Sequence, residues 1–212
     1  LGDHLSETLP GLTYRGSVRQ QLVIDPQVPY TTHNSAACLL CEWPADEPRE
    51  SVVERAGTFL EDVAADGSDP GLCAGRVAEV TDAVGQFGVD AGETVLDESQ
   101  AYDLAADAGL YLSAYGGTGQ GVIGALAAIG RTASGRRGRF VDVGRAREFD
   151  GEVTVERIRE EGVRVRRPTG APVEAGTVET GGWVRPLLRD GRPTLPVEKL
   201  GTDRYRPANL DG

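Results

Sequence analysis

Apolar and polar residues follow one another along the chain with two spacings, one typical of helices and one typical of strands. Residues 1–9 and 50–65 place apolar side chains three and four positions apart, as an amphipathic helix does. The near-continuous apolar run at 36–43 is typical of a buried strand. Because helical and extended segments alternate, the sequence predicts an α/β fold, with α+β as the alternative, in which helices pack on a mixed sheet.

The remaining elements extend this pattern to the C-terminus. Further helices are expected at 77–88, 97–108, 122–129 and 154–161, and further strands at 19–24, 72–74, 140–143 and 163–167. Asp97 and Gln100 have the residue types and spacing of a capping box. Asp190-Gly191 between alternating runs predicts a C-terminal β-hairpin. We expect a first domain over residues 1–150 and a small α+β extension with this hairpin over 151–212.

A glycine-rich stretch directly precedes the apolar, alanine-rich segment at 122–129. Its glycines are Gly116, Gly117, Gly119 and Gly121. Glycine permits backbone angles that other residues avoid, and the first amides of a helix have no partner within the helix. Such a helix end, beside the positive end of the helix dipole, favours an anion and above all a phosphate. The alternative is a tight turn into a core helix without a ligand, because the stretch matches neither the Walker nor the dinucleotide fingerprint.

The composition indicates an acidic protein. The net charge is −11, the pI is about 4.7, and Lys199 is the only lysine among 22 basic residues. This is typical of proteins from salt-loving organisms, whose acidic surfaces keep them in solution. No basic patch marks a nucleic-acid surface. The loop with Arg136, Arg137 and Arg139 is a candidate for RNA contact, or it balances the acidic surface.

The three cysteines, Cys38, Cys41 and Cys73, favour reduced thiols in the cytoplasm, because their number is odd. Cys38 and Cys41 would point to opposite faces of a strand, so we expect buried structural thiols and no zinc site. Acidic pairs on the expected helices are more typical of a solvated surface than of magnesium ligands. No apolar run is long enough to cross a membrane. A chain that starts at Leu1 and lacks methionine is expected to be a fragment or a processed form.

The polar loop at 31–35 holds a histidine among hydrogen-bonding side chains. His33 follows Thr31 and Thr32 and precedes Asn34. An imidazole in this setting can act as a base or contact a phosphate. The alternative is a solvated surface histidine.

Three stretches carry a resemblance to a known family. Residues 25–34, Asp-Pro-Gln-Val-Pro-Tyr-Thr-Thr-His-Asn, are similar to the family's Asn-Pro-x-Ile-Pro-Tyr-Lys-Thr-Arg-Gly-Asn. Residues 119–130, Gly-Gln-Gly-Val-Ile-Gly-Ala-Leu-Ala-Ala-Ile-Gly, are similar to its Gly-Arg-Gly-Leu-Ile-Gly-Ala-Leu-Ala-Ala-Val-Gly, and residues 69–71 to its Asn-Pro-Gly. In this order and spacing the stretches resemble the kinase-like, ATP-handling domain of the archaeal tRNA(Ile) 2-agmatinylcytidine synthetases, over about residues 1–150.

That family joins agmatine to the wobble cytidine of an isoleucine tRNA with ATP and Mg²⁺. The resemblance implies an ATP-dependent ligase in which Thr32 and His33 face the reacting group. It implies a substrate loop made of Pro29, Tyr30, Thr31 and Asn34. It also implies a nucleotide held by Thr118, Gly119, Gly121, Ile123 and Gly124, and tRNA as a partner.

Departures from the family pattern favour a second hypothesis. Thr31, His33 and Gln120 stand where the family has cations, and losing cations weakens the neutralisation of a triphosphate. The family's Asp-Asp-Thr-Asp motif, expected before residues 1–9, and its tRNA-binding OB-fold and zinc-ribbon domains are absent from the sequence. We therefore expect no metal site built from these residues. The alternative is a non-catalytic nucleotide-binding or protein-interaction module, and the oligomeric state stays open.

Overall fold

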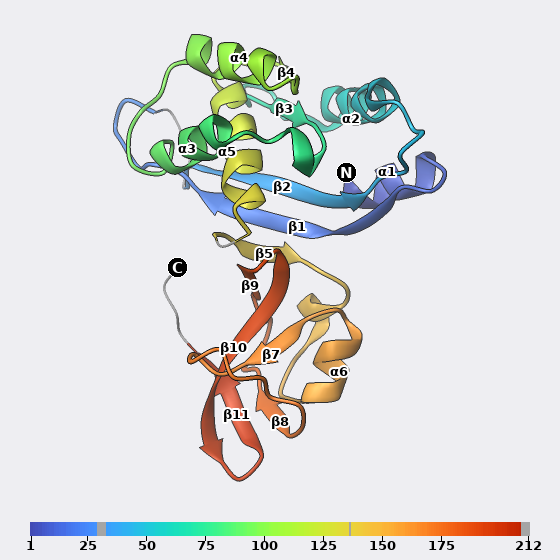
Figure 1. The fold of residues 1–212 in the computed structure, drawn as a ribbon, viewed down its shortest axis with the longest axis vertical. Coiled ribbons are helices and arrows are strands. Elements are labelled where there is room, and N and C mark those ends of the chain that lie inside the picture. The colour runs from blue at the N-terminus through green and yellow to red at the C-terminus, as the bar shows by residue number, and fades with distance from the viewer. Residues whose placement is uncertain (29–32, 136, 209–212) are drawn as a thin grey trace.

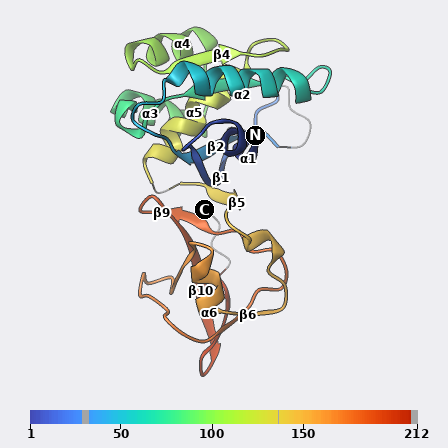
Figure 2. The same ribbon diagram turned by 90° about the vertical axis from the view of Figure 1, so that its right-hand side faces the viewer.

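The computed structural model of the chain describes residues 1–28, 33–135 and 137–208. These residues form two lobes stacked along the long axis of the molecule, with a narrow junction between them (Figures 1 and 2). The N-terminal lobe contains most of the helices, and the C-terminal lobe consists mainly of strands.

The elements follow in chain order. The N-terminal lobe contains α1 (Gly2–Thr8), β1 (Thr13–Gln21), β2 (Ser35–Glu42), α2 (Arg49–Val63), β3 (Gly71–Ala74), the 3₁₀ helix η1 (Val77–Glu79), α3 (Asp82–Asp90), α4 (Glu98–Asp107), β4 (Tyr111–Ala114) and α5 (Gly121–Ala133). The C-terminal lobe contains β5 (Arg139–Asp142), η2 (Ala146–Glu148), β6 (Glu152–Thr154), α6 (Val155–Glu160), β7 (Arg164–Arg166), β8 (Thr177–Glu179), β9 (Leu187–Arg189), β10 (Arg192–Gly201) and β11 (Arg204–Pro207).

A mixed sheet runs through both lobes in the order β2-β1-β5-β9-β10-β11-β8-β6, and β7 pairs in parallel with β10. A second, two-stranded sheet of β3 and β4 belongs to the N-terminal lobe alone. Helices pack on these sheets, which confirms the predicted α/β class with a mixed sheet. The predicted hairpin is also confirmed: β9 and β10 are antiparallel, and Asp190 and Gly191 take the positive φ angles, 51° and 68°, that favour a type I′ turn.

Two predicted elements differ from the observed ones for local reasons. The first strand, expected at 19–24, spans Thr13–Gln21. A bulge between Tyr14 and Gly16 shifts its register and breaks the two-residue alternation on which strand prediction depends. The helix expected at 77–88 is split into η1 and α3, because the Thr81 hydroxyl accepts a hydrogen bond from the amide of Val84 and starts a new helix.

Two core clusters divide the N-terminal lobe into layers. In the first, residues such as Val84, Leu126 and Ala101 bring α3, α4 and α5 together, and Cys73 of β3 packs against them. In the second, α1 and α2 pack together, and the neighbouring Leu72 of β3 packs against them. Because Leu72 and Cys73 lie on opposite faces of one strand, the strands form a middle layer with helices on both sides.

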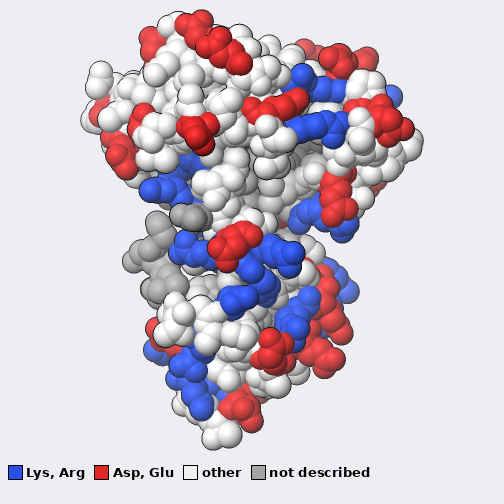
Figure 3. All heavy atoms as spheres, viewed as in Figure 1, with Lys and Arg blue, Asp and Glu red and all other residues white. Residues whose placement is uncertain are grey.

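The C-terminal lobe has its own core, and charge divides unevenly between the lobes. Its core cluster includes Phe140, Ile158 and Leu188, and Val18 of β1 belongs to it as well. The division expected between residues 150 and 151 stays a prediction. Residues 1–138 carry 8 basic and 20 acidic residues, a net charge of −12, whereas residues 139–212 carry 14 basic and 13 acidic residues. Figure 3 shows arginines gathered at the junction and over the C-terminal lobe.

Candidate functional site

The glycine-rich turn joins β4 to α5, and its glycines are required by its shape. Gly116, Gly117 and Gly119 have positive φ angles of 149°, 64° and 93°, a region that side chains other than glycine rarely adopt. Gly121 is needed for a different reason: a Cβ atom there would lie 2.0 Å from the carbonyl oxygen of Asp69. The start of α5 therefore lies directly against the backbone that enters β3.

Asp69 provides an anion at this turn from the chain itself. Its carboxylate accepts hydrogen bonds from the hydroxyl of Thr118 and from the amide of Gly119, the latter at 3.0 Å. Burial acts to raise the pKa of Asp69, but hydrogen bonds from Thr118 and from the backbone of Gly121 and Gly119 outweigh it and hold the pKa below its usual value. A phosphate at these amides would have to displace an ionised side chain.

A second carboxylate approaches the same turn. Glu98, at the start of α4, has an oxygen 3.3 Å from the position that a Cβ atom on Gly119 would occupy. Among the described residues, no group of three or more His, Cys, Asp or Glu side chains is placed to hold a metal ion. Glu98 and Asp69 thus both place a carboxylate beside Gly119.

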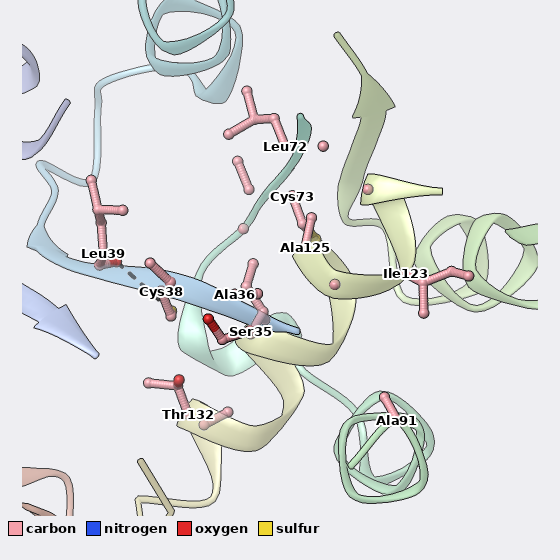
Figure 4. A pocket seen from close by; sticks show the side chains of 18 of the residues that line it. Ser35, Ala36, Cys38, Leu39, Leu72, Cys73, Ala91, Ile123, Ala125 and Thr132 are labelled. Carbon is pink, nitrogen blue, oxygen red and sulfur yellow. Dashed lines mark hydrogen bonds between the residues drawn. The ribbon is translucent and has the colours of Figure 1, made fainter. Parts of the chain in front are cut away.

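A cavity of about 1100 Å³ lies beside the turn, between β2, β3, α5 and α2. Residues from all three stretches of the family resemblance contribute to its wall: Gln27, Val28 and Asn34; Asp69 and Gly71; and Gln120, Gly121, Ile123 and Gly124. Figure 4 shows Ile123 and Ala125 of α5 together with Ala36 and Cys38 of β2 and Cys73 of β3. Apart from the polar groups near the turn, the wall is mainly apolar.

The structure brings together only part of the predicted site. Gly121, Ile123, Gly124 and Asn34 line the cavity, and Thr118 and Gly119 contact Asp69 at its edge. The side-chain amide of Asn34 donates to the carbonyl of Val23 at 2.9 Å, so part of its role is to hold the loop against the end of β1. His33 is exposed and does not contribute to the cavity wall.

Some predicted residues lie outside the described part of the chain. These are Pro29, Tyr30, Thr31, Thr32 and Arg136. Of the other two arginines considered for RNA contact, Arg137 is exposed and Arg139 is half-buried. Sequence reasoning gave Asp69 no role in the site, although an Asp before Pro-Gly, with a side chain that readily bonds nearby amides, was an available signal.

The three cysteines are free thiols, and all of them line the cavity. Burial raises the pKa of Cys38 to about 11 and that of Cys73 to about 12. Both thiols therefore stay protonated at neutral pH and react slowly, because the thiolate is the nucleophile.

We expect the shifted thiols to make the protein less stable in alkali. An unfolded thiol loses its proton near pH 8.5, whereas the folded thiols keep theirs to about pH 11 and 12. The unfolded state then binds fewer protons, so the free energy of unfolding falls as the pH rises from about 8.5 towards 11. Urea denaturation at pH 8 and pH 10.5 measures the fall, and a double variant with Cys38→Ala and Cys73→Ala should show a smaller one. An equal fall in both proteins would contradict this assignment.

Comparison of the chain with models of protein families, with curated proteins and with solved structures found no match. The family resemblance therefore stays a prediction. In the described part of the chain, no helix combines the length and the apolar character that crossing a membrane requires.

Proposed function

We propose that this chain is the nucleotide-binding part of an ATP-dependent, tRNA-modifying ligase similar to the tRNA(Ile) 2-agmatinylcytidine synthetases. One observation supports this proposal above others: the three stretches that carry the resemblance, though far apart in sequence, all contribute residues to the wall of one cavity. The three stretches come together at Gly121, Asp69 and Asn34 because of the way the strands and α5 are arranged. The amino-acid composition alone would not place them in one cavity wall.

In this proposal the nucleotide lies with its phosphates at the start of α5. The backbone around Gly119–Ile123 provides amides and the positive end of the helix dipole. Mg²⁺ bound with the nucleotide would neutralise phosphate charge, with Glu98 as its protein ligand. The loop that carries Thr32 and His33 would face the reacting group. The contribution of the protein to the reaction is mainly positioning and charge stabilisation.

The proposal predicts that Asp69→Asn strengthens ATP binding. Asparagine keeps an oxygen that can accept from the Gly119 amide but removes the negative charge beside the phosphates. We expect the Kd for ATP with Mg²⁺ to fall about tenfold, which corresponds to about 1.4 kcal/mol. Isothermal titration of the wild type and of Asp69→Asn measures this.

One control variant and two possible outcomes define how the result is interpreted. Asp66→Asn makes the same change in the exposed loop before Asp69 and should leave the Kd unaltered. Absence of detectable ATP binding by both the wild type and Asp69→Asn would contradict a nucleotide site. Binding without any agmatine-dependent modification of tRNA would leave the nucleotide site and contradict the ligase.

A second candidate function is a binding module without catalysis. Three observations favour it: Asp69 already satisfies amides of the turn, the cavity wall is mainly apolar, and residues 1–138 carry a net charge of −12, which repels a polyanion such as tRNA. This candidate predicts that ATP with Mg²⁺ leaves the melting temperature unchanged. A rise in the melting temperature with ATP would argue against it.

A further inference from the structure

Three strands of the N-terminal lobe, β2, β3 and β4, each have an edge with no described strand beside it. Within the described residues, β2 pairs only with β1, and β3 pairs only with β4. An unpaired edge presents a row of backbone N–H and C=O groups. The edges of β2 and β3 both border the cavity described above (Figure 4). Its wall includes every residue of 34–43 and 71–77.

The two strands run in the same direction on either side of this space. Arg76, which follows β3, donates a hydrogen bond of 2.9 Å to the carbonyl of Pro44, which follows β2, and its guanidinium lies 4.7 Å from the centre of the Trp43 ring. The carboxyl ends of β2 and β3 therefore lie next to each other. At the amino ends, the first turn of α5 contacts both strands. A Cβ atom added to Gly71 of β3 would meet Gly121 of α5, and a Cβ atom added to Gly124 of α5 would meet Ala36 of β2.

Helices cover both faces of the space, as they cover the strands beside it. On one face, Gly124 and Ala125 of α5 contribute only a small surface to its wall. On the other face, Leu5 of α1 and Val52 and Ala56 of α2 line it. The space is therefore a slot in the strand layer between two helix layers. Its volume of about 1100 Å³ exceeds the roughly 300–1,000 Å³ of common small-molecule sites.

The edges of the slot carry no charge. Residues 35–41 of β2 and 71–75 at β3 include no Asp, Glu, Lys or Arg, although a quarter of the chain, 26%, is charged. Of the charged residues that line the slot, Glu42, Asp69 and Arg76 lie at the ends of the two edges, and Arg15 lies on β1, where it forms an ion pair with Glu42. An occupant that matches this wall is uncharged in its central part, and an inserted strand presents backbone N–H and C=O groups to both facing edges at once.

We propose that the slot is the docking site for an extended polypeptide strand of a partner, uncharged over its central residues, which pairs with β2 on one side and β3 on the other. Strand addition of this kind takes its affinity from backbone hydrogen bonds and its specificity from alternate side-chain pockets. The inserted strand joins the two sheets into one. This inference does not depend on the proposed nucleotide site.

A matched pair of peptides tests the inference. The probe alternates valine and alanine over seven residues with a lysine at each end, and its control has proline at the central position, where the missing N–H interrupts pairing. We expect the probe to slow the alkylation of Cys38 and Cys73, which line the slot from opposite edges, at least fivefold. We also expect it to slow amide exchange along both β2 and β3. The proline peptide should do neither.

A tethered form keeps the test decisive if the free peptide binds weakly. The side chain of Leu1 lines the slot, so each peptide can be fused ahead of Leu1 through a short Gly-Ser linker, which raises its effective concentration to about the millimolar range. Equal alkylation rates in the two fusions would overturn the proposal. Protection of only one strand, equal protection by a fatty acid, or protection that rises with protein concentration alone would overturn it as well, the last by indicating a second copy as the occupant.

Discussion

Replacing Gly121 by alanine is expected to lower the free energy of unfolding by about 3 kcal/mol, near the upper end for overpacked sites. The added Cβ atom would lie 2.0 Å from the carbonyl oxygen of Asp69 and 2.8 Å from the amide nitrogen of Gly71. Both contacts are with backbone, so no side-chain rotation relieves them. The start of α5 must move away from β3, and the hydrogen bond between Asp69 and the Gly119 amide must lengthen with it.

Gly124→Ala is the matched control on the same helix. Its Cβ atom would meet side-chain atoms of Leu22 and Ala36 at 3.4 and 3.5 Å, which are ordinary van der Waals contacts. Alanine is also favoured over glycine inside a helix by about 1 kcal/mol. We therefore expect Gly124→Ala to leave stability unchanged or to raise it by up to about 1 kcal/mol. Urea denaturation of both variants measures the difference, and equal losses would contradict the close approach at Gly121.

The sequence predicted the glycine-rich turn and the helix after it because both depend on neighbouring residues. Glycines crowded before an alanine-rich apolar run already indicate unusual backbone angles followed by a helix, and Gly117 and Gly119 do have positive φ angles. The contact between Asp69 and this turn could not be predicted in the same way. It joins residues separated by 50 positions, and it exists only because β3 pairs with β4.

The cavity was beyond sequence reasoning for a related reason. The apolar run at 36–43 correctly predicts a strand, β2, but an apolar run does not show which strand lies beside it. Cys38 and Cys73 belong to different sheets and yet line one cavity, because α5 packs across both strands. An unpaired edge is a property of the assembled layer, and no local pattern encodes it.

Gln20→Ala is expected to lower the free energy of unfolding by about 3 kcal/mol, since it both leaves a cavity and removes the partner of a buried cation. Gln20 is 1% exposed. Its side-chain amide donates to the Thr132 hydroxyl at 3.0 Å and to the carbonyl of Arg137 at 2.8 Å, and its oxygen accepts from Nε of Arg131 at 3.3 Å. This one side chain therefore ties β1 to the end of α5 and to the loop that leads into β5.

Two comparisons separate this network from a general effect of substitution. Gln21→Ala makes the same change at the next residue, which is exposed, and should alter stability by no more than about 0.5 kcal/mol. Arg131→Met removes the buried guanidinium, so Gln20→Ala should cost about 1–2 kcal/mol less in that background, because no buried N–H is then left without a partner. Burial lowers the pKa of Arg131, as expected of a cation held away from water. Equal costs of Gln20→Ala in both backgrounds would mean that lost volume, and not the hydrogen bond to Arg131, accounts for the loss of stability.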